Sequence, residues 1–270
     1  MPYKMVVLDL DDTLLRDDLT ISPRTRDTLL KAQDQGVVVV LASGRPTGAM
    51  RQYARELELE RHGGWVLSFN GAVITECATG KIIFEQSLSP ELVHEIHDLA
   101  AIHGANILSY VDDRILTPKA DAWTAVEHHL TGMDVVEVAD FKGAIRGPAV
   151  KAIVLQEPDR LREVADKIRP EVAGRLSMTI SKPFFLEFTD NGIDKRHSLA
   201  RLLAHLGIEA LDVVAIGDGH NDAGMIQLAG LGVCMENGAP EVRALADHVT
   251  GSNMDDGVAQ AVERFVLNAG

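Results

Sequence analysis

The sequence predicts an α/β protein whose Rossmann-like, mainly parallel sheet is interrupted by an inserted α+β domain. Uninterrupted apolar runs at residues 5–8, 37–42 and 213–216 are typical of parallel strands that are buried on both faces. Segments with helical spacing of apolar residues separate these runs, as in βαβ units. From about residue 85 the pattern changes to short strands in hairpins that alternate with helices, which indicates an α+β unit.

The first two strands bring polar residues to one edge of the predicted sheet. Residues 5–8 lead directly into Asp9. A helix that is capped by Ser22, with proline at its first position, ends at a glycine just before the strand at residues 37–42. A strand, a helix and a strand of this spacing form a right-handed βαβ unit. Ser43, directly after the second strand, is therefore expected beside Asp9.

The middle of the chain predicts a second domain that is inserted into the first. Asn70-Gly71 is a turn signal after a further strand, and a hairpin follows it. Residues 85–188 form the predicted α+β insert, and residues 1–84 and 189–270 form the predicted core. The turn residues at 190–192 make the second crossing between the domains a candidate hinge.

The parallel pattern resumes after the insert and supplies more polar residues. The strand at residues 213–216 ends in the segment Gly217-Asp218-Gly219-His220-Asn221-Asp222. The carboxyl ends of the strands in an open parallel sheet form its binding crevice, so the residues that follow the three strands should meet there. The candidate site residues are Asp9, Asp11, Ser43, Asp218, Asn221 and Asp222, with Lys195 at a helix start as a nearby cation.

The residue types in this crevice indicate phosphate chemistry with a metal ion. Neighbouring carboxylates repel each other and resist desolvation, and a hard cation such as Mg2+ suits oxygen ligands best. Asp9 and Asp218 are the natural ligands for it. Acids, a metal and donors from Ser, Lys and Asn suit a phosphoryl group, whose transfer needs an in-line nucleophile. The three acids after the first strand alone leave a second interpretation open, in which they only solvate the strand end.

Composition narrows the class of protein and its partners. Of the 270 residues 46% are apolar and 24% charged, as in soluble globular proteins. The net charge of −14 argues against nucleic acid or an anionic membrane as the main partner. There is no apolar segment of membrane-spanning length and no room for a signal peptide before the first strand. The two cysteines fit buried thiols in a reducing compartment, so a cytoplasmic protein is expected. The oligomeric state cannot be read from the sequence.

Four segments, in this order, resemble the motifs of the haloacid dehalogenase (HAD) superfamily of phosphotransferases. Asp9-Leu10-Asp11-Asp12-Thr13-Leu14 is similar to the first motif, DxDxT, and Ser43-Gly44-Arg45 is similar to the second. Lys195 matches the third motif, and residues 217–222 match the fourth, GDxxND. The position and length of the insert resemble the C2-type cap of the Cof-type sugar phosphatases, and other short segments resemble the YidA-like enzymes of that group.

The resemblance implies a HAD core with a substrate-specificity cap, and a Mg2+-dependent hydrolase of small phosphorylated metabolites of the sugar phosphate class. Asp9 would be the nucleophile that forms an aspartyl-phosphate, and Asp11 the general acid and base. Mg2+ would be bound by Asp9, by Asp11 through its backbone carbonyl, and by Asp218. The phosphate would be held by the Leu10 amide and by Ser43, Lys195 and Asn221. The supporting residues would be Gly44, Arg45 and Asp222, the last by orienting Lys195 or metal-bound water.

Two residues and two functions are left open at this point. Arg45 would either brace its loop or contact phosphate, and Asp12 stands where many relatives have glycine. One alternative function is a sugar phosphomutase or phosphotransferase on the same scaffold. The other is a non-catalytic protein that binds phosphorylated metabolites, and the intact Asp9, Asp11 and Lys195 argue against it.

Overall fold

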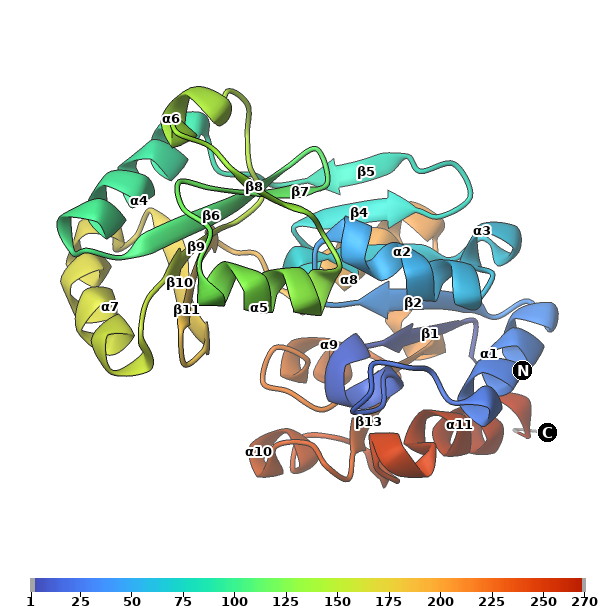
Figure 1. The fold of residues 1–270 in the computed structure, drawn as a ribbon. Helices are drawn as coiled ribbons and strands as arrows, with labels where there is room; N and C mark the ends of the chain where they lie inside the picture. The colour runs from blue at the N-terminus through green and yellow to red at the C-terminus, as the bar shows by residue number, and fades with distance from the viewer. Residues whose placement is uncertain (1–2, 269–270) are drawn as a thin grey trace. The chain divides into compact units, whose positions relative to one another are not determined.

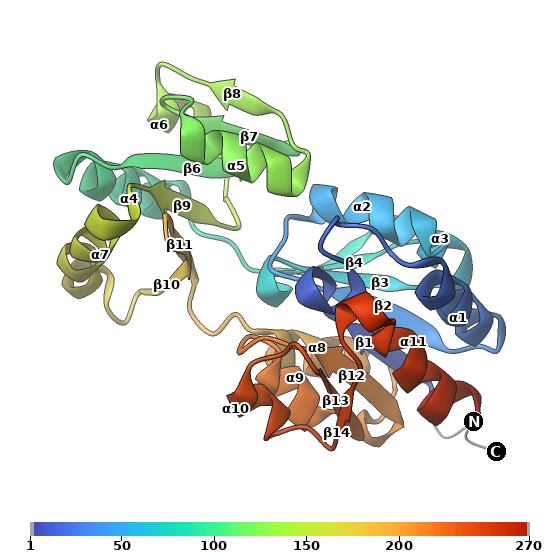
Figure 2. The same cartoon turned by 60° about the horizontal axis from the view of Figure 1, so that its bottom comes forward.

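The computed structural model describes residues 3–268 and divides the chain into two compact units (Figures 1 and 2). The first unit combines the chain up to Phe84 with the chain from Asp194 onward, and the second is Glu85–Ile193. Each unit has its own sheet and its own apolar core. The predicted α/β class is confirmed.

The first unit contains an eight-stranded sheet in the order β14-β13-β12-β1-β2-β3-β4-β5. Pairing is parallel from β14 through β3, and β4 is antiparallel to β3. The central strands are apolar at every position because both of their faces are covered. The strands are β1 (Met5–Leu8), β2 (Val38–Ala42), β3 (Trp65–Ser68), β4 (Val73–Glu76), β5 (Ile82–Glu85), β12 (Val213–Gly217), β13 (Leu231–Met235) and β14 (His248–Thr250).

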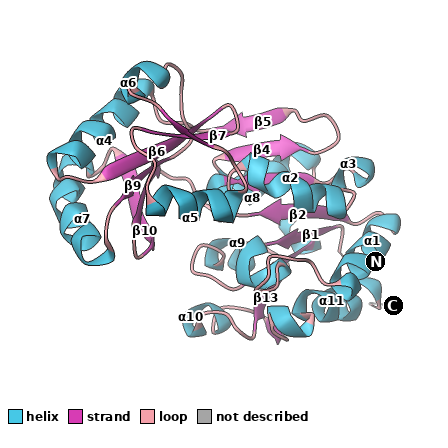
Figure 3. Cartoon of the chain, in the orientation of Figure 1, coloured by secondary structure: helices cyan, strands magenta, loops and turns pink. Residues whose placement is uncertain are grey.

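Helices cover both faces of this sheet and make three layers (Figure 3). Val6 and Leu8 pack with Leu29 on one face, whereas Met5 and Val7 pack with α8 on the other. The first face is covered by α1 (Pro23–Asp34), α2 (Thr47–Glu56), α3 (Leu59–His62) and α11 (Gly257–Val262). The second is covered by α8 (Lys195–Leu206) and α9 (Ala223–Leu228), and the short α10 (Pro240–Arg243) packs near β13.

The second unit is an α+β arrangement around a six-stranded sheet in the order β10-β11-β9-β6-β7-β8. Its neighbouring strands pair antiparallel, except for β7 and β8, which are parallel. The strands are β6 (Asn106–Val111), β7 (Arg114–Thr117), β8 (Val135–Glu137), β9 (Ala152–Leu155), β10 (Leu176–Lys182) and β11 (Phe185–Asp190). The helices are α4 (Pro90–Ile102), α5 (Ala122–Thr131), α6 (Phe141–Ala144) and α7 (Pro158–Val172).

One domain boundary differs from the expected one. The second unit ends at Ile193 rather than at residue 188, because β11 continues its pairing with β10 through Asp190. Helix α2 begins at Thr47, because the extended Pro46 ends the preceding loop. Within residues 3–268, no helix has both the length and the apolar character that crossing a membrane requires.

Candidate functional site

Three central strands of the first unit end side by side. β1 pairs in register with β2 on one side and with β12 on the other, where Leu8 lies opposite Ile216. The pairing continues one residue further, since the Asp9 N–H donates to the Ile216 carbonyl at 3.0 Å. Ser43 and Asp218 follow β2 and β12 directly, so they emerge at the same edge as Asp9.

A buried lysine joins two of the acids at this edge. Lys195 is the first residue of α8, whose N-terminus is capped by the Asp194 side chain. Its Nζ donates to Asp9 Oδ1 and, at 2.5 Å, to Asp222 Oδ1. Lys195 and Asp222 are inaccessible to solvent, and Asp9 is 6% exposed. The lysine therefore fixes the orientation of both carboxylates in a site that excludes most water.

Asp222 also builds the turn after β12. Its Oδ2 accepts hydrogen bonds from the backbone N–H groups of Asp218 at 3.1 Å and of Gly219 at 2.9 Å. A Cβ atom at Gly217 would lie 2.5 Å from the Cβ of Asp222, so this close approach requires glycine. Both carboxylate oxygens of Asp222 thus have partners within the protein, which favours the expected role of orienting Lys195.

Burial and neighbouring charges shift the pKa values of Asp9, Asp218 and Lys195. Burial and the charge of Asp222 raise the pKa of Asp9 well above its ordinary value, against the opposing effect of Lys195. Burial raises the pKa of Asp218 to about 6, although a hydrogen bond from Thr13 Oγ1 at 2.8 Å opposes this. Burial would lower the pKa of Lys195, but Asp222 and Asp9 raise it above its usual value. Three acids thus share one buried cation.

The residues fit a divalent metal ion. Asp9, Asp218 and Asp222 each offer a ligand atom, and these atoms lie within 4.8 Å of one another. Carboxylate oxygens are the hard ligands that Mg2+ prefers, and a second cation would offset the charge that Lys195 leaves uncompensated. Asp9 and Asp218 are the better candidates, because both oxygens of Asp222 already accept hydrogen bonds.

Arg45 binds the second acid of the first motif. Its Nε donates to Asp11 Oδ2 at 2.9 Å and its Nη2 donates to Asp11 Oδ1 at 2.5 Å. Arg45 is 8% exposed, whereas the Asp11 side chain is 47% exposed. The two parallel bonds fix the plane of the carboxylate. This contact joins the loop after β2 to the loop after β1, as the bracing alternative expects, and phosphate binding by Arg45 stays a prediction.

The backbone conformation at Asp12 shows why an aspartate is tolerated where many relatives have glycine. Asp12 has a φ of +59°, in the left-handed region that favours glycine and that Asp tolerates better than most residues. Its carbonyl accepts a hydrogen bond from Asn237 Nδ2 at 2.7 Å. The loop of residues 10–14 therefore keeps its shape with Asp in place of the expected glycine.

The remaining predicted residues lie at the same edge of the sheet. The Ser43 side chain is buried, and its Oγ accepts a hydrogen bond from the backbone N–H two residues further on. Leu10 anchors its loop with a buried side chain. Asn221 Nδ2 donates to Asn70 Oδ1 at 3.1 Å, and a Cβ atom at Gly44 would lie 3.3 Å from the Asn70 amide. The residues nominated from the sequence are thus brought together.

Two residues of the site were not nominated from the sequence. Thr13 is buried and its hydroxyl donates to Asp218, whereas the first motif predicts no partner for it. The pair Asn70-Gly71 predicts only a turn. The signal that could have found Asn70 is its position, because it follows β3, which neighbours β2 in the same parallel sheet.

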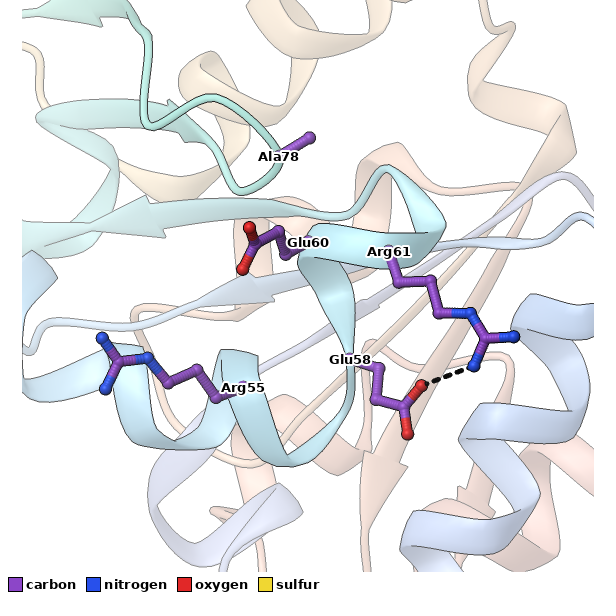
Figure 4. Close-up of a pocket in the computed structure, with 5 residues that line it drawn as sticks. All are labelled: Arg55, Glu58, Glu60, Arg61 and Ala78. Carbon is purple, nitrogen blue, oxygen red and sulfur yellow. Dashed lines mark hydrogen bonds and ion pairs between the residues drawn. The ribbon is translucent and has the colours of Figure 1, made fainter.

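A separate hollow in the first unit contains none of the nominated residues (Figure 4). Its volume is about 510 Å³, and it is lined by Arg55, Glu58, Glu60, Arg61 and Ala78. Arg61 and Glu58 form an exposed ion pair at 3.0 Å. The lining comes from α2, α3 and the turn after β4, so this hollow is distinct from the strand ends that carry the acids.

Comparison with known proteins agrees with this geometry. The family model that matches residues 6–262 is described as haloacid dehalogenase-like hydrolase. The chain is 33% identical to YxeH of Bacillus subtilis, which carries the provisional name of a phosphatase, over 98% of this chain and 99% of YxeH. It is 29% identical to YcsE of the same organism, named 5-amino-6-(5-phospho-D-ribitylamino)uracil phosphatase, over 98% of this chain and 96% of YcsE.

A solved structure has the same fold. The crystal structure of a haloacid dehalogenase-like hydrolase from Bacteroides thetaiotaomicron is similar to this chain with a TM-score of 0.95 and 38% identity. The similarity covers 97% of this chain and 99% of the other. Both units of the fold are therefore shared with that protein.

Proposed function

The chain belongs to the haloacid dehalogenase-like hydrolases, and we propose that it is a Mg2+-dependent phosphatase that works through an aspartyl-phosphate on Asp9. As a phosphatase of this family it acts on small phosphorylated metabolites. The proposed parts are the metal, the covalent intermediate, the roles of the site residues and the preference for sugar phosphates.

The observation that carries the proposal is the contact of Lys195 with Asp9. A nucleophilic carboxylate must be ionised and correctly oriented, yet burial favours its neutral form. Lys195 donates to Asp9 directly and is itself held by Asp222. The lysine therefore supports the charged form of Asp9 and leaves the other carboxylate oxygen of Asp9 available for attack.

In the first step, a carboxylate oxygen of Asp9 attacks the phosphorus of the bound ester. The bond between phosphorus and the ester oxygen breaks, and the leaving alkoxide takes a proton from Asp11. Arg45 limits the directions in which the Asp11 carboxyl can point, because it binds both oxygens of that group.

In the second step, water attacks the phosphorus of the aspartyl-phosphate and gives its proton to Asp11. The bond between phosphorus and the Asp9 oxygen breaks, which releases inorganic phosphate and restores both acids. The Leu10 amide, Ser43 and Asn221 would donate to the non-bridging oxygens in both steps. Mg2+ bound by Asp9, Asp218 and the Asp11 carbonyl would neutralise charge between the carboxylate and the phosphate.

We propose sugar and sugar-alcohol phosphates as the substrate class. The resemblance of the insert to the caps of Cof-type sugar phosphatases supports this class. The relative YcsE is named for a substrate that carries a phosphorylated ribityl chain. The second unit is proposed to select the leaving group.

A substrate panel tests the proposed function. Phosphate release would be measured from sugar, sugar-alcohol and nucleoside monophosphates, with Mg2+ and with EDTA. We expect release that requires Mg2+ and is fastest for the sugar and sugar-alcohol phosphates. Binding without release would contradict the proposal and favour a binding protein. A requirement for a sugar bisphosphate activator would favour the mutase.

Removing the charge of Asp218 should stabilise the metal-free protein and abolish its response to Mg2+. Because the pKa of Asp218 is raised from 3.8 to about 6 in the folded state, ionisation of Asp218 destabilises the fold as the pH rises through that interval. An asparagine side chain lacks this charge and keeps the oxygen that accepts from Thr13. With EDTA at pH 8, Asp218→Asn is expected to raise the free energy of unfolding by about 1–2 kcal/mol, discounted for partial exposure.

Urea denaturation at pH 4 and pH 8, with EDTA and with Mg2+, measures both effects. In EDTA, the difference in the free energy of unfolding between Asp218→Asn and the native protein should be small at pH 4. At pH 8, Mg2+ should stabilise the native protein but not Asp218→Asn. Asp27→Asn, at an exposed position on α1, serves as the control. Equal stabilisation of the Asp218→Asn variant by Mg2+ would contradict the assigned metal site.

Replacing Arg45 distinguishes its two possible roles. Arg45→Met removes both hydrogen bonds to Asp11, so kcat should fall by about 10- to 100-fold while KM changes little. Arg45→Lys keeps the charge but not the paired bonds, so its kcat should lie between those of the native protein and of Arg45→Met. Steady-state kinetics with the best panel substrate measures both parameters. A rise in KM at unchanged kcat would show that Arg45 binds phosphate instead.

A further inference from the structure

The segment Phe69-Asn70-Gly71 after β3 has an unusual backbone. Phe69 and Asn70 have φ values of +52° and +57°, so two consecutive residues other than glycine are left-handed. Such a conformation is unfavourable for phenylalanine and persists only where surrounding contacts hold it. Here the Phe69 N–H donates to the Arg45 carbonyl at 2.9 Å, and the Asn70 N–H donates to the Ser43 carbonyl at 2.8 Å. The segment is thus fixed to the loop that carries Ser43.

The side chain of Asn70 connects two loops of the proposed phosphate site. Its Oδ1 accepts a hydrogen bond from Asn221 Nδ2 at 3.1 Å. Its amide also lies against Gly44, where an added Cβ atom would be 3.3 Å from both Nδ2 and Oδ1 of Asn70. Asn70 therefore lies between the loop after β2 and the loop after β12.

The next residue contacts the helix that carries Lys195. Ser198 Oγ donates to the Gly71 carbonyl at 2.6 Å. Gly71 has a φ of +97°, and a Cβ atom there would overlap Ser198 Oγ. A side chain at this position would thus push α8 away from the segment. The three-residue segment therefore contacts the loop after β2, the loop after β12 and helix α8, each of which carries a residue of the proposed site.

We propose that Asn70 is a positioning residue that orients the side-chain amide of Asn221 for phosphate binding. An asparagine amide presents donors on one side and an acceptor on the other. With Asn221 Nδ2 bound to Asn70, one N–H is used and the second stays available for a phosphate oxygen. If Asn221 turned over, its own Oδ1 would face Asn70 Oδ1 and an acceptor would face the anion. This inference rests on the proposed phosphatase function.

Two substitutions of Asn70 separate positioning from backbone strain. Asn70→Gly removes the side chain and suits the left-handed backbone, whereas Asn70→Ala removes the side chain and keeps the strain. With the best panel substrate, both variants should raise KM by about 5- to 20-fold with little change in kcat. The inhibition constant of inorganic phosphate should rise by the same factor. Only Asn70→Ala should also lower thermal stability.

A double-variant comparison shows whether Asn70 acts through Asn221. If it does, Asn70→Gly combined with Asn221→Ala should raise KM no further than Asn221→Ala alone. Glu58→Gly is the matched control, because Glu58 is also left-handed, with φ +51°, and lines the separate hollow of Figure 4. It should leave KM unchanged.

The outcomes distinguish this inference from the function on which it rests. A native protein that releases no phosphate from any panel member would overturn the proposed function itself. An active native protein with unchanged KM in Asn70→Gly, or with additive effects in the double variant, would overturn the role of Asn70 alone. A loss of stability in both single variants without a change in KM would show a purely structural residue.

Discussion

Replacing Asp9 by Asn is expected to lower Mg2+-dependent phosphate release by at least about 1,000-fold. Asn has nearly the same size and keeps an oxygen that can accept the hydrogen bond from Lys195 Nζ. It lacks the negatively charged oxygen that attacks phosphorus, so the loss of activity should appear in kcat. The metal-free fold should not weaken, because burial of the charged form of Asp9 is already unfavourable.

Phosphate release and urea denaturation of the same preparation measure the two parts of this expectation. Asp27→Asn removes an exposed carboxylate from the same unit and should retain full activity. Activity of the Asp9→Asn variant within ten-fold of the native protein would contradict nucleophilic catalysis by Asp9. Such a result would leave the electrostatic role of the acid cluster intact and would require another nucleophile.

Lys195→Met should have the largest effect on stability, lowering the free energy of unfolding by about 3–5 kcal/mol at pH 7. The substitution leaves the carboxylates of Asp9 and Asp222 buried without the cation that contacts both. Methionine fills a similar volume, so packing contributes little to the loss. Acidification should reduce the difference from the native protein, because protonation then removes the unpaired charge.

A double substitution separates charge from packing in this experiment. Lys195→Met with Asp222→Asn removes one cation and one anion, so it should recover part of the stability in urea denaturation at pH 7. It should remain inactive, since Asp9 has no donor to orient it. A double variant that is less stable than Lys195→Met would show that packing or the turn after β12 dominates.

The core fold was predictable because its signals are local. Continuous apolar runs such as residues 37–42 are typical of strands that are covered on both faces, and Ser22-Pro23 begins α1 as expected. The final residues of parallel strands lie at one edge of the sheet, so the sequence alone predicts that Asp9, Ser43 and Asp218 lie together.

The contacts that define the site are tertiary and could not be predicted in the same way. Sequence spacing does not indicate that Arg45 turns toward Asp11, or that Asp222 holds both Lys195 and the turn after β12. Left-handed residues such as Asn70 depend on bonds from distant loops, so a turn signal alone does not reveal a role in the site. The end of the second unit was also missed, because β11 extends beyond its apolar residues.

The most direct measurement of the central claim is the isolation of the phosphorylated protein. Native protein and the Asp11→Asn variant would be mixed with 32P-labelled substrate and Mg2+, stopped in acid after a short interval, and digested for peptide analysis. The proposed mechanism predicts label on the peptide that contains Asp9, and more label in Asp11→Asn because the hydrolysis step loses its base. Turnover without labelled protein in either form, or label on a peptide that lacks Asp9, would contradict it.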